Sequence, residues 1–366
     1  EGLGHTLRAV ERRGARACLR VGDPVDVIAE LAVDAAEVVF DRGYLRHQRE
    51  WYHQLASRIE RRFTQIEVDV VVPTAVASDR LETGARTIRP RINDRRNDFL
   101  VALETTALDN HTTPQGTTSD IGLDELADPD SIAAVLDRLG VADQPGPVLG
   151  WSPGTAGARA ALSTFLDAVT SGHGYDEVRN HYTDDDGTSR LSPYLHFGQI
   201  SPVQVANIVI DRLGDDAEPF LEELIVRREL AVNYVLHNDD YDTFAGLPEW
   251  AHSSLDAHRD DAREHVYTAS ELAAGETHDE VWTASMGEIR RTGWVHNQLR
   301  MYWGKQIVHW TNTPEHAFHT LLDINHRWFL DGRDPNSYTN VAWCFGRHDQ
   351  GFKEREVSGK LRPFTT

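Results

Sequence analysis

The chain has 366 residues, of which 40% are hydrophobic and 26% charged, which gives enough length for two folded domains and argues against wholesale disorder. Its two cysteines cannot build a disulfide framework, no apolar run is long enough to cross a bilayer, and no signal-peptide pattern opens the chain. We therefore expect a cytoplasmic protein that makes no membrane contact.

The charge of the chain is strongly acidic but uneven. The 58 acidic against 37 basic residues give a net charge of −21, which argues against nucleic-acid binding over the whole surface. Residues 211–280 hold 19 acidic and 5 basic side chains, a net of −14, whereas residues 289–310 hold four basic and no acidic ones. A local basic face and ordinary solvated helix faces both fit this pattern. Only three of the cations are lysines, which fits either a surface hydrated in concentrated salt or drift to arginine in a GC-rich genome.

Helices and strands alternate in the N-terminal part of the chain. The predicted helices lie at 1–13, from 24 to about 32, and at 44–62, and the predicted strands lie at 17–21, 37–40 and 68–72. Asp23 before Pro24 is typical of an N-cap followed by a proline in the first helical turn. Such alternation indicates a parallel, Rossmann-like sheet. Because three strands make a thin sheet, we expect an N-terminally truncated α/β domain.

A polar segment and a helical region follow. Residues 104–150 are rich in Thr, Asp, Gly and Pro, which indicates a linker with one short helix at 129–139. From residue 151 onward the pattern is helical, and the longer helices are predicted at 154–169, 201–213, 217–236, 280–311 and 313–328. The sequence thus predicts an incomplete α/β domain over 1–103, a linker over 104–150, and an all-α domain over 151–366.

The first chemistry-bearing segment of the helical region is DGTSRLSPYLHFGQIS, residues 186–201. A glycine and three hydroxyl side chains precede Pro193, a residue that often begins a helix. Backbone N–H groups and hydroxyls at a helix N-terminus suit a diphosphate. A simple capped helix entry explains the composition at least as well.

Two further segments place polar groups among aromatic ones. Within residues 282–310, Asn297 and Arg300 interrupt an otherwise aromatic stripe at helical spacing, and Asp331 is a candidate partner for a buried Arg300. Residues 321–346 set amides and charged groups between two aromatic clusters; these are Asn325, Asp331, Arg333, Asp334, Asn336 and Asn340. Such a set suits a heteroaromatic ligand with many hydrogen-bonding edges, and a polar loop between two helices is the alternative.

The 18 histidines raise the question of a metal site. His316 and His319 are three residues apart, with His309 nearby, but the sequence contains no HExxH motif and no paired cysteines. We expect scattered surface or capping histidines and no bound metal.

Taken together, these segments resemble the cryptochrome/photolyase family, and most closely its class II cyclobutane pyrimidine dimer photolyases. The resemblance covers essentially the whole chain. It is carried by ASDRLETGARTIRPRI (77–92), the segment 186–201, FLEELIVRREL (220–230), TGWVHNQLRMYWGKQIVHW (292–310) and LDGRDPNSYTNVAW (330–343). The motif LDGRDPN followed by AW is highly specific for class II.

The resemblance implies an all-α domain that binds FAD in a bent form, and light-driven electron transfer from reduced flavin to a flipped-out pyrimidine dimer in UV-damaged DNA. Residues that match the family's flavin-binding positions are Tyr175, Arg179, Thr188, Ser189, Arg190, Leu191, Ser192, Arg300, Asn325, Asp331, Arg333 and Asp334. In the family, the match of Arg300 and Asp331 is an ion pair beside the isoalloxazine ring, and that of Asn325 faces flavin N5. Residues that match the dimer pocket are Glu223, Asn297, Met301 and Trp343, with Glu223 bonded to the pyrimidines.

The resemblance also implies that Trp303, Trp282 and Trp310 relay electrons, with Trp303 nearest the flavin. Trp282 and Trp303 are 21 residues apart, roughly 31 Å on one straight helix, which is too far for a direct transfer. The relay therefore predicts a break in this helix at Thr292–Gly293.

The sequence departs from the family pattern in two places. Residues 348–352 read HDQGF where the family usually has a basic-aromatic pattern, which removes one expected DNA-backbone contact. The family's first strand, its helix and its second strand precede residue 1, so we expect a deazaflavin antenna, typical of class II, to lack part of its pocket.

The alternatives to repair are a cryptochrome-like blue-light photoreceptor and a flavin-free helical interaction module. The matched dimer pocket favours repair. We expect a monomer whose partner is UV-damaged DNA, with no obligate protein partner.

Overall fold

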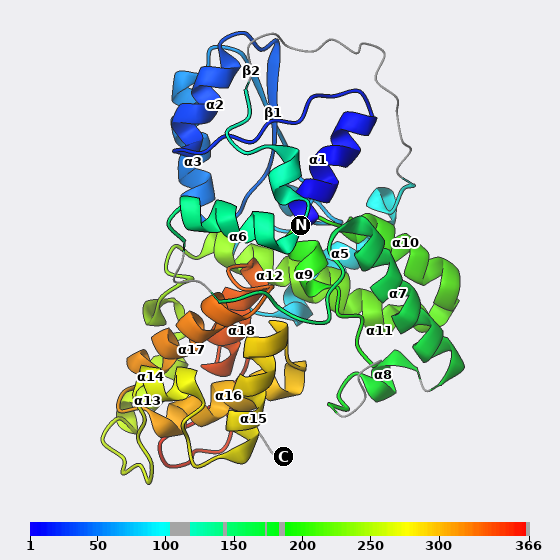
Figure 1. Ribbon diagram of the computed structural model, residues 1–366. Helices are drawn as coiled ribbons and strands as arrows, with labels where there is room; N and C mark the ends of the chain where they lie inside the picture. The colour runs from blue at the N-terminus through cyan, green and yellow to red at the C-terminus, as the bar shows by residue number, and fades with distance from the viewer. Residues whose placement is uncertain (103–117, 142–144, 173, 183–186, 364–366) are drawn as a thin grey trace.

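The computed structural model describes residues 1–102, 118–141, 145–172, 174–182 and 187–363. A small α/β part lies above a larger helical part in Figure 1. The α/β part consists of α1 (Gly2–Arg12), α2 (Pro24–Ala32), β1 (Glu37–Asp41), α3 (Arg46–Arg58) and β2 (Arg62–Ile66). Residue 103 and two parts of the predicted linker, 104–117 and 142–144, lie outside the described residues.

The rest of the described chain is helical. Its helices are α4 (Thr74–Ala77), α5 (Ala85–Phe99), η1 (Leu123–Leu126), α6 (Pro129–Arg138), α7 (Gly154–Ser171), α8 (Tyr175–Val178), α9 (Ser192–His196), α10 (Pro202–Leu213), η2 (Gly214–Ala217), α11 (Glu218–Leu221), η3 (Glu222–Arg227), α12 (Arg228–His237), η4 (Phe244–Gly246), α13 (Glu249–Ala257), α14 (Ala269–Ala274), α15 (Glu280–Thr292), α16 (Asn297–Trp310), α17 (Pro314–Trp328) and α18 (Pro335–Cys344). None of the described helices is long and apolar enough to span a bilayer.

The sheet is parallel, as predicted, but among the described residues it has two strands rather than three. β1 pairs with β2 from Glu37 opposite Arg62 to Asp41 opposite Ile66. The helix before β1 begins as predicted, because Asp23 Oδ1 accepts hydrogen bonds from the backbone of Val25 and Asp26 at 2.9 and 3.2 Å.

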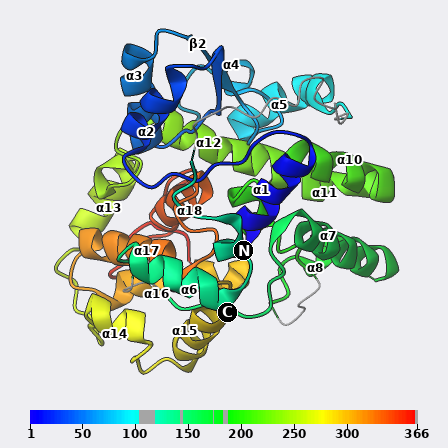
Figure 2. The ribbon, with the colours of Figure 1, turned by 45° about the horizontal axis from the view of Figure 1, so that its top comes forward.

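The strand predicted at residues 17–21 is wrong. These residues are irregular, and their backbone groups bond to the polar segment around Ser119 instead of to a neighbouring strand. Leu19 N donates to Ser119 Oγ at 2.7 Å, and Val21 N donates to Asp120 Oδ2 at 2.8 Å. The helix before this segment packs on helical elements: α1 contacts η1 and α7. Figure 2 shows α1 and α7.

The strand predicted at residues 68–72 is also wrong. The second strand is β2, which begins at the last residue of the helix predicted over 44–62, and α3 ends earlier than predicted, at Arg58. Residues 70–72 are buried, as their apolar pattern predicted, but a side chain satisfies their backbone. The N–H groups of Val71 and Val72 donate to Oε1 of Glu229 on α12 at 2.7 and 3.1 Å.

Burial raises the pKa of Glu229 to about 8, because desolvation outweighs the two N–H donors and the charge of Arg228. The folded-state pKa exceeds the ordinary value of 4.5, so the stability contribution is fully present below pH 4.5 and is lost as the pH rises toward about 8.

We expect Glu229→Gln, which keeps an acceptor oxygen and cannot ionise, to remove this pH dependence. The difference in unfolding free energy between variant and wild type should widen with pH by up to about 1.4 kcal/mol per pH unit between the two pKa values. Urea unfolding at a series of pH values measures this difference. Parallel stability profiles for the two proteins would contradict the assigned protonation.

The packing joins the segment after β2 to the helical region. Val71, Val72, Ile88 and Ile92 share one buried cluster with α7, α9 and α10, so α4 and α5 pack with helices that follow residue 151. A second cluster contains the buried faces of α12 and α15–α18. The domain boundary at residue 103 stays a prediction.

The predicted break within residues 280–311 is confirmed. α15 ends at Thr292, Gly293 has a φ of 69°, and α16 begins at Asn297. A Cβ atom on Gly293 would lie 2.6 Å from Leu330 Cγ, so both the left-handed backbone and the close approach require glycine here. A second irregularity is the π-helical turn η3 between α11 and α12. Such turns are rare in proteins overall, and those that occur often lie at functional sites.

Candidate functional site

The helical part contains a cavity of about 290 Å³ between η3, α12 and the helices α16–α18. Its walls bring together most of the residues singled out in the sequence. The predicted residues that line it are Tyr175, Thr188, Ser189, Arg190, Leu191, Ser192, Glu223, Asn297, Arg300, Met301, Trp303, Asn325, Asp331 and Asp334. The three polar segments of the sequence therefore converge on one concave site.

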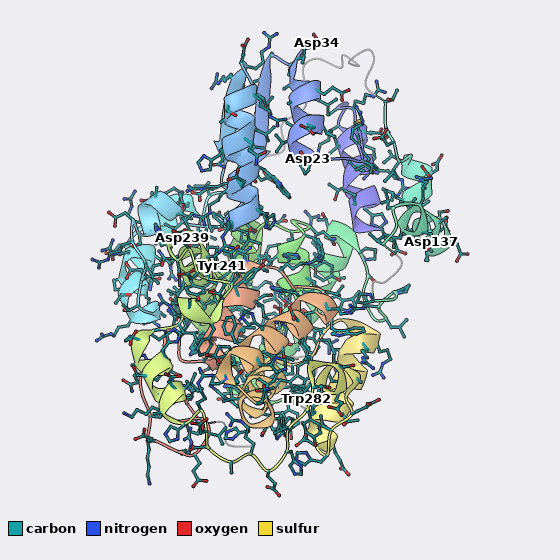
Figure 3. All side chains as sticks on the ribbon, turned by 90° about the vertical axis from the view of Figure 1, so that its left-hand side faces the viewer. Asp23, Asp34, Asp137, Asp239, Tyr241 and Trp282 are labelled. Carbon is teal, nitrogen blue, oxygen red and sulfur yellow. The ribbon has the colours of Figure 1, made fainter. Side chains whose placement is uncertain are left out.

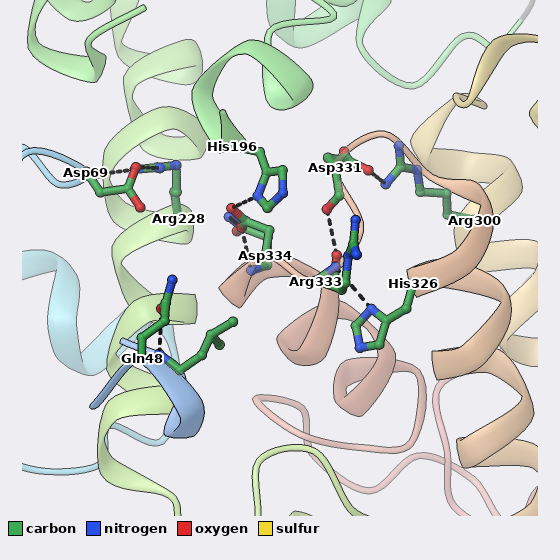
Figure 4. Close-up of polar contacts among 12 residues, drawn as sticks. Gln48, Asp69, His196, Arg228, Arg300, His326, Asp331, Arg333 and Asp334 are labelled. Atoms are coloured by element: carbon green, nitrogen blue, oxygen red, sulfur yellow. Dashed lines mark hydrogen bonds and ion pairs between the residues drawn. The ribbon is translucent and has the colours of Figure 1, made fainter. Parts of the chain in front are cut away.

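Arg300 and Asp331 form the ion pair that the sequence predicted. Arg300 Nη1 donates to Asp331 Oδ1 at 2.9 Å, and the guanidinium lies 3.9 Å from the ring centroid of Phe329 (Figure 4). The backbone oxygen of Asp331 accepts a hydrogen bond from Ser337 Oγ at 2.8 Å. The side chains of Arg300 and Asp331 are only 22% and 11% exposed, so the pair is a fixed polar feature of the cavity wall.

Three buried polar atoms of cavity-lining residues find no hydrogen-bond partner among the described residues. They are Thr188 Oγ1, Trp303 Nε1 and Asn325 Oδ1. Buried polar atoms are normally satisfied, so these donors and acceptors are available to a ligand. Their chemistry fits a flavin, whose ring presents both donors and acceptors along its polar edge, and whose diphosphate accepts hydrogen bonds from hydroxyl groups.

Glu223 and Glu222 are adjacent but have different partners. Glu223 lines the cavity and accepts a hydrogen bond from Arg179 Nη1 at 2.7 Å. Glu222 is held by two bonds of 2.8 Å from Arg89 and one of 3.0 Å from Arg227. The two acids start the π-helical turn, and their separate ion pairs leave one carboxylate for the cavity.

Three indoles lead away from the cavity. Trp303 lines it, the ring centroid of Trp282 lies 5.0 Å from that of Trp303, and that of Trp310 lies 5.4 Å from that of Trp282. Figure 3 shows Trp282 deep in the helical part. The turn at Gly293 folds α15 back on α16 and produces this series. The electron-transfer role of the three indoles stays a prediction.

Besides Trp282 and Trp310, three predicted site residues do not line the cavity. Arg179 contacts two lining residues, because it bonds Glu223 and its guanidinium lies 5.4 Å from the ring centroid of Tyr175. Trp343 has the Arg227 guanidinium 5.3 Å from its ring centroid. Arg333 is exposed, has a φ of 61°, and donates its backbone N–H to His326 Nδ1 at 3.0 Å. Its side chain therefore has no cavity contact.

Asp334 has a structural and an electrostatic role at the site. It is the N-cap of α18, accepting from Asn336 N at 2.9 Å, and its Oδ2 lies 3.2 Å from His196 Nδ1. Burial by itself would raise the pKa of Asp334, but the bond to His196, the charge of Arg228 and the Asn336 N–H keep that pKa below its ordinary value. Asp334 is thus an ionised group in the cavity wall.

Sequence reasoning missed Arg228, Trp294 and Phe329, which also line the cavity. Arg228 belongs to the quoted run FLEELIVRREL, and the available signal was a basic pair that directly follows the apolar residues 224–226. Asn336 and Asn340, noted in the sequence only as part of a polar cluster, line the cavity as well. Among the described residues, no three metal-ligating side chains gather at one point.

Comparison with known proteins gives a consistent result. The protein-family model for DNA photolyase matches residues 1–110. A deoxyribodipyrimidine photo-lyase of Methanothermobacter thermautotrophicus is 39% identical over 99% of this chain and 78% of its own length. Proteins of the same name from Potorous tridactylus and Arabidopsis thaliana are each 36% identical, over 94% and 93% of this chain, and this chain spans 64% and 69% of their lengths.

Solved structures confirm the predicted fold class. A class III photolyase from Agrobacterium tumefaciens matches with a TM-score of 0.67 at 20% identity, covering 94% of this chain and 70% of the other. A cryptochrome from Synechocystis matches with a TM-score of 0.68 at 14% identity, covering 97% and 71%. At these identities the likeness concerns the arrangement of an α/β part and a helical part.

Proposed function

The chain belongs to the DNA photolyase family, and on that premise we propose that it is a class II deoxyribodipyrimidine photolyase that uses light to split cyclobutane pyrimidine dimers in DNA. The observation that carries the proposal is a cavity with unsatisfied polar atoms in its wall, into which a series of three indoles leads. The motif LDGRDPN followed by AW supports the assignment to class II.

We propose FAD as the cofactor of this cavity. The hydroxyl groups of Thr188, Ser189 and Ser192 precede or begin α9 and suit the diphosphate, whereas Arg300, Asp331 and Asn325 suit the isoalloxazine ring. When bound and reduced, the flavin supplies the light-excited electron that cleaves the dimer. Class II membership also predicts a deazaflavin antenna, for which the α/β part would provide the pocket.

The protein's own contribution is placement and electrostatics. The walls exclude water, and the Arg300–Asp331 pair fixes a charge pattern beside the ring. Glu223, held by Arg179, offers an acceptor to pyrimidine N–H groups, and Asn297 and Met301 line the cavity from the N-terminal part of α16. Trp303, Trp282 and Trp310 pass electrons toward the cavity to restore the reduced cofactor.

The decisive experiment is illumination of the reduced, flavin-loaded protein with an oligonucleotide that contains a thymine dimer. Recovery of thymine absorbance is the expected result. A protein that binds flavin and responds to light but restores no thymine would be a photoreceptor, and a protein that stays colourless with excess FAD would refute the cofactor assignment.

We expect Glu223→Ala to weaken binding of dimer-containing DNA about tenfold and to lower the repair yield, while flavin stays bound. A hydrogen bond to an ionised group contributes about 1.5–3 kcal/mol, and this acceptor would be lost. Titration of the protein with labelled oligonucleotide and repair under a fixed light dose measure the two effects.

Glu218→Ala is the matched control. Glu218 lies one turn earlier, and its partner is Arg96, at 2.7–2.9 Å, away from the cavity lining. This variant should bind and repair like the wild type. Unchanged repair in Glu223→Ala would remove Glu223 from the dimer pocket.

A further inference from the structure

Arg228 connects the cavity to the α/β part of the molecule. It begins α12, lines the cavity, and has a side chain only 8% exposed. Its Nη2 donates to Asp69 Oδ1 at 2.6 Å, and its Nη1 donates to the backbone oxygen of the same residue (Figure 4). Asp69 follows β2, so a residue of the cavity wall is held from outside the helical part.

The segment that carries Asp69 is itself fixed. Glu229, the next residue of α12, accepts the N–H groups of Val71 and Val72. Two consecutive helix residues therefore hold the segment 69–72. Arg228 binds the carboxylate and the backbone oxygen of Asp69, and Glu229 binds the backbone N–H groups that follow. This double attachment gives Asp69 a defined position relative to the cavity.

The electrostatics require such a partner. A guanidinium does not deprotonate, and a buried one without an anion strongly destabilises the fold. The acidic side chains near Arg228 are Asp69, Asp334 and Glu229, and Asp334 is itself bonded to His196. Asp334 belongs to the cavity wall, and burial holds Glu229 largely neutral. Asp69, which does not line the cavity, therefore supplies the negative charge that balances the Arg228 guanidinium.

We propose that Asp69 is a positioning residue for the cofactor: it orients Arg228 so that a fixed positive charge faces an anionic group of the bound flavin. The inference rests on the proposed function, because it takes FAD as the ligand. The anionic group is either the diphosphate or the reduced ring. Asp69 itself does not line the cavity, so its effect on the ligand passes through Arg228.

The test measures the dissociation constant of FAD, by quenching of flavin fluorescence, for the wild type and for Asp69→Asn. We expect about a tenfold weaker affinity in the variant, the lower end of what loss of an outer partner costs at metal sites. Glu67→Gln is the matched control, because Glu67 lies two residues before Asp69 and pairs with Arg42 at 3.4 Å and with Thr74. It should leave FAD affinity unchanged.

A double-mutant cycle separates positioning from general damage to the fold. In an Arg228→Met background, Asp69→Asn should cause no further loss of FAD affinity, whereas full additivity of the two losses would overturn the proposal. Riboflavin, which lacks phosphate, identifies the anionic group: an Asp69→Asn effect lost with riboflavin assigns the charge to the diphosphate, and an effect confined to reduced flavin assigns it to the ring.

The outcomes distinguish this inference from the proposed function. If the wild type does not bind FAD, the proposed function fails. If the wild type binds FAD and Asp69→Asn binds it equally well, only the positioning role fails. Should Asp69→Asn be insoluble, Asp69→Glu keeps the charge but lengthens the side chain, and wild-type FAD affinity in that variant would equally contradict the proposal.

Discussion

Replacing Trp303 with phenylalanine is expected to slow light-driven reduction of the bound flavin on the order of tenfold or more, equivalent to at least about 1.4 kcal/mol in the barrier. Trp303 is the indole that both lines the cavity and packs on Trp282, at 5.0 Å between ring centroids. A phenyl ring is much harder to oxidise than an indole, so the series would be interrupted at its first member. Illumination without oxygen, in the presence of an external reductant, measures the rate through loss of oxidised-flavin absorbance.

The comparison needs a tryptophan outside the series. Trp250 of α13 is partly buried against the helical core, and Trp250→Phe should reduce its flavin at the wild-type rate. Repair by Trp303→Phe should persist when the flavin is reduced chemically, because the dimer reaction does not pass through the indoles. Photoreduction at the wild-type rate in Trp303→Phe would exclude this residue from the relay.

Arg300→Leu is expected to lower the unfolding free energy of the flavin-free protein by about 3 kcal/mol, because it leaves the Asp331 carboxylate unpaired in a largely buried position. The same variant should lose most of its affinity for FAD, since the guanidinium forms one wall of the cavity. Urea unfolding without flavin and titration with FAD measure the two losses separately.

Two controls define the result for Arg300. Arg212→Leu removes an exposed ion pair with Asp167, whose side chains are 46% and 66% exposed, and should cost about 1 kcal/mol or less. Adding Asp331→Asn to Arg300→Leu should restore part of the stability, because the unpaired charge is gone. If Arg300→Leu alone were as stable as the wild type, the Arg300–Asp331 ion pair would make no contribution to the stability of the fold.

The helical architecture and most of the cavity wall could be predicted because local sequence determines them. The break before α16 follows from Gly293, whose conformation few other residues adopt. Asp23 and Pro24 likewise mark the start of α2 through bonds within a single turn. Motifs of contiguous polar residues, such as residues 186–201, lead to the cavity because one short segment supplies several of its lining residues.

The errors occur where a distant side chain replaces a local partner. Residues 70–72 are apolar and buried like a strand, but a carboxyl group from Glu229, 157 or 158 residues along the chain, accepts the N–H groups of Val71 and Val72. Arg228 was missed for the same reason, because its partner Asp69 is 159 residues away. No periodicity in either segment reports such a pairing.

The attachment of residues 69–72 to α12 limits how short a flavin-binding fragment of this protein can be if it is to fold on its own. A fragment starting near residue 151 would leave the Arg228 guanidinium and the Glu229 carboxyl without their partners and would uncover the apolar faces that receive Ile88 and Ile92. Protein engineers who wish to transplant or minimise the helical part should therefore retain the chain from about residue 69, or supply a substitute peptide with an aspartate at the matching place.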